Sequence, residues 1–123
     1  MKLREWQEAA FGMLGLETAL SIVQKTMVDT GLIKWDVVAE RMSHAPARIG
    51  GYARQGEKIA VGSTANLTVI NPTGSWRVDR DLVLSNSSNT PYHRHELPGV
   101  ILHTFFKGKQ TINNGTVKDM GSM

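Results

Sequence analysis

The amino-acid sequence changes character at Gly50-Gly51, from apolar residues at helical spacing to short runs separated by glycine and proline. Before this point, apolar residues recur every three or four positions, which is typical of amphipathic helices. From Gly56 onward, the runs are rich in Val, Ile, Thr and Phe, which is typical of strands between turns. The sequence therefore predicts a helical first part and a β-rich second part.

The helical part begins with two apolar periodic segments. They predict helices over residues 6–14 and 16–27, with Gly12 and Gly15 at the joint between them. A third helix is expected over residues 35–42.

Ser43 follows this third helix and is placed to cap a further turn that runs through Ile49. The inward face of the helix over residues 35–42 is expected to carry Val37, Val38 and Met42.

The second part predicts few strands. One is expected over residues 65–70, ending at Asn71-Pro72, and one over residues 100–109, turning at Gly108. Residues 76–78 predict a short third strand. Because two or three strands alone are only marginally stable in water and leave sheet edges open, the pattern is typical of a piece of a larger fold.

Charge does not indicate a nucleic-acid partner. The net charge is +3, but Lys and Arg are spread from Lys2 to Lys118 instead of clustering with aromatic residues. Cysteine is absent, so any metal would need His or carboxylate ligands, and a reducing compartment is favoured. Apolar runs are far shorter than the ~20 residues of a membrane helix. Neither a secretory signal nor a membrane partner is expected, and a cytoplasmic location is predicted.

Four phrases occur in order: AAFGMLGLETAL over residues 9–20, HAPARIGG over residues 44–51, GEKIAVGSTANLTVINP over residues 56–72 and SNSSNTPY over residues 85–92. Their order and spacing resemble the C-terminal part of bacterial dihydroorotases, which belong to the amidohydrolase superfamily. One departure is Asn66, where the family usually has Asp, and it falls at a position that supports the fold.

The resemblance implies an α/β fold class: the last helices of a (β/α)8 metal-dependent hydrolase barrel plus strands of a small β-sandwich domain. Residues 1–55 would be the terminal loop and helices of the barrel, and residues 56–118 the C-terminal strands of the sandwich. Residues 119–123 would be a tail, in which Gly121-Ser122-Met123 resembles an expression-vector remnant. The N-terminal part of the same enzyme would pair with the open strand edges.

The activity that the resemblance implies is the reversible, zinc-dependent hydrolysis of (S)-dihydroorotate to N-carbamoyl-L-aspartate in de novo pyrimidine biosynthesis. In the family, a pair of zinc ions polarises the carbonyl and lowers the pKa of water from 15.7 toward ~7. No metal ligand and no catalytic residue can be assigned to this chain, because the family's ligands would lie upstream of Met1. The chain alone is expected to be inactive and to bind no zinc.

The resemblance assigns substrate binding to Phe11 and Gly12, in a loop whose glycine lets the backbone approach the substrate. From the residues alone, the alternative is that Gly12 separates two helices while Phe11 fills the core. Glu17 is open to interpretation as a general acid, but its place near a helix N-terminus favours a role with the helix dipole.

His93 and His95 form a His-x-His pair, a pattern that can hold a metal when it lies on a strand. Here it follows Pro91, so a solvated loop with two surface histidines is favoured. His44 and His103 are expected to be packing or surface residues.

Three hypotheses follow. The first is part of a dihydroorotase, with a small-molecule substrate and a homodimer or a transcarbamoylase as partner. The second is a non-catalytic dihydroorotase-like module that supports a transcarbamoylase. The third is an independent metal binder that uses His93, His95 and His103.

Overall fold

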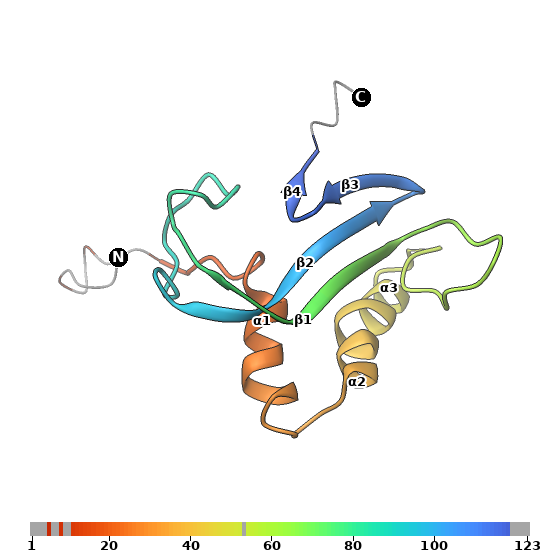
Figure 1. Cartoon of the computed structure of the whole chain (residues 1–123), viewed down its shortest axis with the longest axis horizontal. Helices are drawn as coiled ribbons and strands as arrows, with labels where there is room; N and C mark the ends of the chain where they lie inside the picture. Colours follow the sequence, from red (N-terminus) through yellow and green to blue (C-terminus); the bar gives the residue numbers. More distant parts are fainter. Residues whose placement is uncertain (1–4, 6–7, 9–10, 53, 119–123) are drawn as a thin grey trace.

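The computed structural model describes residues 5, 8, 11–52 and 54–118. Figure 1 shows two helices lying beside a long antiparallel sheet. The first helix (residues 19–28) joins α1 (Ala19–Val23) to the π-helical η2 (Gln24–Val28). The second helix (residues 35–49) joins α2 (Trp35–Ala39), the π-helical η3 (Glu40–His44) and α3 (Ala45–Ile49). None of the helices in the described part of the chain is long and apolar enough to cross a membrane.

The first helix confirms the prediction over residues 16–27, although it starts later. The predicted helix over residues 6–14 is wrong at its described end, because residues 11–14 are not helical and Gly12 has a φ of 70°. A left-handed glycine cannot continue a right-handed helix. Trp6, Ala9 and Ala10, which suggested this helix, lie outside the described residues.

The second helix is longer than predicted. Ser43 does not cap a separate turn; it lies inside η3, and the helix continues without a break through Pro46. Proline has no N–H for the helical ladder, and the wider π-helical stretch directly before it is where the hydrogen bonding is rearranged. Val38 is buried as predicted, but Val37 and Met42 are 37% and 42% exposed, so the inward face is narrower than predicted.

The sheet has four strands in the order β1-β2-β3-β4, each antiparallel to its neighbour. The strands are β1 (Leu67–Arg77), β2 (Glu96–Phe106), β3 (Lys109–Asn113) and β4 (Thr116–Val117). The predicted strands over residues 65–70 and 76–78 are two ends of β1. Asn71-Pro72 interrupts the pairing with β2 but does not end the strand.

The side chain of Asn71 explains this interruption. Its Oδ1 accepts hydrogen bonds from the backbone N–H groups of Thr73 at 3.1 Å and Gly74 at 3.2 Å. The side chain thus stands in for a backbone acceptor, as in an Asx turn, and the strand resumes at Ser75 opposite Pro98.

The predicted turn at Gly108 is confirmed. Lys107 and Gly108 both have positive φ, of 50° and 80°, as a type I′ hairpin between β2 and β3 requires. Asn114 and Gly115, with φ of 47° and 75°, form a matching turn between β3 and β4 that the sequence prediction missed.

Asn66 ties this hairpin to the start of β1. Its Nδ2 donates to the carbonyl of Arg54 at 2.8 Å, and its Oδ1 accepts from the N–H of Lys107 at 2.8 Å. An ionised Asp has no N–H to donate to Arg54. The predicted fold-supporting role of this position is confirmed, and this chain uses both ends of the amide.

The predicted α/β class is confirmed: helices in the first part are followed by an antiparallel sheet. The division between residues 55 and 56 stays a prediction. The tail over residues 119–123 lies outside the described residues.

Candidate functional site

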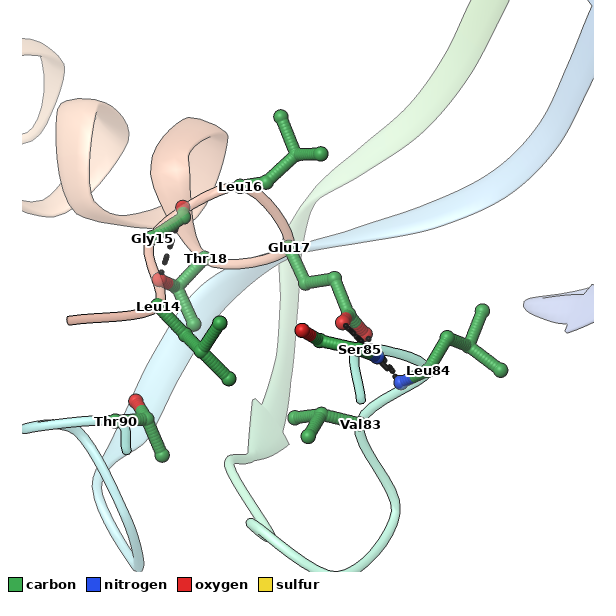
Figure 2. Close-up of a pocket in the computed structure, with 9 residues that line it drawn as sticks. All are labelled: Leu14, Gly15, Leu16, Glu17, Thr18, Val83, Leu84, Ser85 and Thr90. Carbon is green, nitrogen blue, oxygen red and sulfur yellow. Dashed lines mark hydrogen bonds between the residues drawn. The ribbon is translucent and has the colours of Figure 1, made fainter. Parts of the chain in front are cut away.

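The first and the fourth of the sequence phrases meet beside the start of the first helix. There a loop over residues 11–18 faces a turn over residues 83–90, and a hollow of about 400 Å³ lies between them. Figure 2 shows the side chains around this hollow and the carboxylate of Glu17 extending to the opposite backbone. The hollow is lined by Leu14, Gly15, Leu16, Glu17, Thr18, Val83, Leu84, Ser85 and Thr90.

Asn89 holds the loop at two neighbouring points. Its Nδ2 donates to the carbonyl of Gly12 at 2.7 Å, and its own carbonyl accepts from the N–H of Leu14 at 2.9 Å. These bonds join segments that are far apart in sequence. They fix the course of the loop just before the first helix begins.

Glu17 makes the second connection between the two segments. Its carboxylate accepts from the backbone N–H of Leu84 at 3.2 and 3.3 Å and from that of Ser85 at 3.3 Å. The first helix begins at Ala19 and has no acidic residue in its first turn. The carboxylate of Glu17 binds the amides of the opposite turn, and its role with the helix dipole stays a prediction.

Phe11 and Gly12 lie at the open end of this loop. The side chain of Phe11 is fully exposed, so it does not fill the core of the described chain. A Cβ atom added to Gly12 would meet no atom within 4 Å. Glycine is required there by its φ of 70° and not by crowding. The backbone of Gly12 is thus open to approach from outside, but its role in binding stays a prediction.

The first helix, which follows this loop, is fastened to the sheet by buried polar groups. Ser21 Oγ accepts from Trp76 Nε1 at 3.0 Å and donates to the carbonyl of Gly99 at 3.3 Å. Gln24 Nε2 donates to the carbonyl of Pro72 at 2.7 Å. Ser21 and Gln24 are 3% and 2% exposed. Since buried polar groups are costly when unpaired, these contacts define one position of the helix on the sheet.

Sequence reasoning missed the roles of Ser21, Gln24 and Asn89. A serine and a glutamine on the apolar face of a helix were one available signal, since polar residues at such positions need partners. No local signal shows that Asn89 reaches Gly12.

The His-x-His pair is split between two environments. The side chain of His93 is only 19% exposed, and its Nδ1 accepts from the N–H of Arg80 at 3.2 Å. The prediction of two surface histidines is therefore wrong for His93, whose imidazole accepts a hydrogen bond from the backbone of the turn. His95 is exposed and stacks edge-on against Tyr92, with 6.1 Å between ring centroids.

The other two histidines also serve the fold. The Nδ1 of His44 is hydrogen-bonded to the carbonyl of Gly56, which ties the second helix to the following loop. The Nδ1 of His103 accepts from Gln110 Nε2 at 3.2 Å and from the N–H of Asn114 at 3.4 Å. Within the described residues, no three or more His, Cys, Asp or Glu side chains form a group that could hold a metal. The metal-binder hypothesis gains no support.

Comparison with known proteins places these features in a family. No protein-family model matches the chain. The dihydroorotase of Streptomyces coelicolor is 50% identical over 111 residues, which is 90% of this chain and 26% of the relative. The dihydroorotase of Mycobacterium leprae is 47% identical over 110 residues, which is 89% of this chain and 26% of the relative. The chain thus spans about a quarter of the length of these relatives.

A solved structure agrees with the sequence relatives. The L-hydantoinase (dihydropyrimidinase) from Arthrobacter aurescens matches with a TM-score of 0.79 and 28% identity, over 90% of this chain and 25% of that protein. Dihydroorotases and hydantoinases are both cyclic amidohydrolases, and the match lies in the C-terminal part. The chain is therefore a homologue of the C-terminal part of dihydroorotases.

Proposed function

We propose that this chain forms a dihydroorotase together with the N-terminal part of that enzyme. The assembled enzyme would add water across the ring amide of (S)-dihydroorotate to give N-carbamoyl-L-aspartate, and would close the ring in reverse, a step of de novo pyrimidine biosynthesis. The observation that carries this proposal is the 50% identity to a dihydroorotase over 90% of the chain. The chain alone would be inactive.

In this proposal, the chain contributes the substrate loop (residues 11–15), and Phe11 and Gly12 contact the substrate. The open space beside the α-carbon of Gly12 supports this role, because it lets a ring oxygen or carboxylate of the substrate approach the backbone there. The exposed ring of Phe11 is available to cover the apolar part of a bound ring. The polar contacts of Asn89 and Glu17 hold the loop for this purpose.

The metal belongs to the other part of the enzyme. The residues that the structure describes do not fit a two-zinc site, because no group of three or more ligand-type side chains occurs among them. We therefore assign the zinc ligands to the N-terminal part. When bound there, zinc would supply Lewis-acid polarisation of the carbonyl and a hydroxide at neutral pH.

The exposed apolar side chains support an N-terminal partner. They occur on the loops as well as on the second helix, and include Phe11, Leu16, Leu32, Ile49, Ile59, Val61, Leu82 and Leu84, each at least 72% exposed. Large exposed apolar surface marks interaction sites in folded proteins. We propose that the helices complete a (β/α)8 barrel and that the strands complete a β-sandwich with the N-terminal part.

Co-expression tests the proposal directly. The chain would be produced with the N-terminal part of the Streptomyces coelicolor dihydroorotase, purified with zinc, and assayed for dihydroorotate hydrolysis. The relative's own C-terminal part, produced in the same way, is the matched positive control. We expect hydrolysis by the mixed complex and none by the chain alone.

Two results would contradict this function. Hydrolysis by the chain alone would place the metal site within it. A stable mixed complex without hydrolysis, beside an active control, would favour a non-catalytic module that supports a transcarbamoylase. Sedimentation of the assembled enzyme, alone and with aspartate transcarbamoylase, would separate a homodimer from that larger assembly.

A further inference from the structure

We propose that Asn89 is a positioning residue for substrate binding, acting through the substrate loop from a turn more than seventy residues away. This inference rests on the proposed function, because it presumes that Phe11 and Gly12 face the substrate. Asn89 itself does not touch the substrate in this proposal. It determines where the backbone of Gly12 lies.

The turn that carries Asn89 is held by its own side chains. Ser85 Oγ accepts from the N–H of Ser87 at 3.4 Å, and Ser87 Oγ accepts from the N–H of Asn89 at 3.4 Å. Thr90 Oγ1 accepts from the N–H of Tyr92 at 3.2 Å. Such side-chain to backbone bonds replace regular secondary structure in tight turns. The turn is thus a preformed support from which Asn89 extends.

Glu17 fixes this support at its other end. Its carboxylate binds the amides of Leu84 and Ser85, so the turn cannot move away from the start of the first helix without breaking charge-assisted bonds. The first helix is in turn fixed to the sheet by Ser21 and Gln24. The loop, the turn and the helix therefore form one connected unit.

Gly12 needs this support more than another residue would. A glycine at a φ of 70° has many other backbone conformations open to it. The bond from Asn89 Nδ2 to the Gly12 carbonyl restricts the ψ angle of Gly12, and the bond from the N–H of Leu14 restrains the next residues. Without the side-chain bond, the binding-competent loop becomes a smaller fraction of the population, which weakens apparent affinity in proportion.

The test uses the assembled enzyme with two pairs of matched variants. Asn89→Ala and Asn89→Asp remove the Nδ2 donor, and the second keeps the size of the side chain. Asn86→Ala and Asn86→Asp make the same changes in the same turn, at an exposed residue whose side chain has no hydrogen bond among the described residues. Steady-state kinetics with dihydroorotate and hydrogen exchange of peptides over residues 11–18 are measured for all four.

We expect the KM of Asn89→Ala to rise about ten-fold with kcat changed less than about three-fold, as the loss of one hydrogen bond predicts. Asn89→Asp is expected to raise KM at least as much, because its carboxylate faces the Gly12 carbonyl. Both are expected to speed exchange over residues 11–18. Both Asn86 variants are expected to match the wild type. A merely structural role would lower the active fraction, and therefore kcat, without raising KM.

A KM for Asn89→Ala within two-fold of the Asn86→Ala value would overturn the inference. If the wild-type complex does not hydrolyse dihydroorotate while the positive control does, the proposed function fails. Hydrogen exchange over residues 11–18 then decides whether Asn89 holds the loop. Faster exchange in Asn89→Ala than in Asn86→Ala would still support the holding of the loop by Asn89. Equal exchange would refute it.

Discussion

The two helices are attached to the rest of the molecule in different ways. The first helix is held on the sheet by two buried polar side chains, Ser21 and Gln24, whose partners lie on β1 and at Gly99 of β2. The second helix buries only small or branched side chains, at Val38, Ala45 and Ala47, and leaves much of its apolar surface exposed. Figure 1 shows both helices beside the long strands.

This difference separates two tasks. Polar contacts demand a definite geometry, whereas apolar contacts tolerate sliding. In the proposed function, the first helix carries the substrate loop, so a defined position on the sheet gives that loop a defined position as well. In the same proposal, the second helix offers surface to the N-terminal part, and its exposed apolar side is what such an interface requires. Four substitutions, in order of decreasing expected loss of stability, test this separation.

Gly99→Ala should cost the most. The added Cβ would lie 2.5 Å from Gln24 Oε1, and the φ of Gly99 is 81°. Because Gln24 is buried and bonded to Pro72, we expect a loss of about 3 kcal/mol in the free energy of unfolding, measured by urea denaturation. Gly108→Ala is the control: its φ of 80° is nearly the same, but an added Cβ would meet no atom within 4 Å, so a loss of about 1 kcal/mol is expected. Equal losses would mean that the helix is not held tightly at Gly99.

Ser21→Ala should cost about 2 kcal/mol in the same measurement, because it leaves the Trp76 N–H and the Gly99 carbonyl without their partner. Thr26→Ala removes a hydroxyl from the exposed side of the same helix, where its one partner among the described residues is the carbonyl of Ile22. That control should change stability by less than about 0.5 kcal/mol. Similar losses of stability for the two variants would mean that the hydrogen bonds of Ser21 do not hold the helix on the sheet.

Gly12→Ala should cost about 1 kcal/mol through its positive φ alone, and should also raise the KM of the assembled enzyme for dihydroorotate. Gly51→Ala is matched to it, since its φ is 68° and the space around it is also open. We expect equal losses of stability for the two variants and a change of KM only for Gly12→Ala. A rise in KM for both would remove Gly12 from the substrate site.

Ile49→Ser should have the smallest effect on the chain itself, below about 0.5 kcal/mol, because the side chain is already 85% exposed. Its effect should appear on assembly, as weaker binding to the N-terminal part in a titration followed by calorimetry. Ala39→Ser, an exposed position on the same helix, is the control and should leave that affinity unchanged. If Ile49→Ser binds the N-terminal part with unchanged affinity, that part does not cover this end of the helix.

Local patterns were sufficient for part of the fold. Apolar periodicity located both helices, and the runs of Val and Ile located the long strands, because these signals depend on neighbouring residues only. Asn114-Gly115 carried the strongest short hairpin signal in the chain and was overlooked. The continuity of β1 past Pro72 was not predictable in this way, because it depends on the side chain of Asn71 and on pairing with β2.

The candidate site was less accessible to sequence reasoning. Phe11 and Gly12 were proposed through a resemblance, and the exposed loop is compatible with that role. The partners of Asn89 and Glu17 were not foreseen, because each contact joins residues more than sixty positions apart. Only the folded chain brings these segments together.

Hydrogen exchange of the two helices, before and after assembly with the N-terminal part, tests the separation of tasks most directly. The account predicts slow exchange over residues 19–28 in the chain alone and little change on assembly. Over residues 35–49 it predicts faster exchange in the chain alone and marked slowing once the N-terminal part is bound. Equal protection of both helices before assembly, with no slowing over residues 35–49 afterwards, would contradict it.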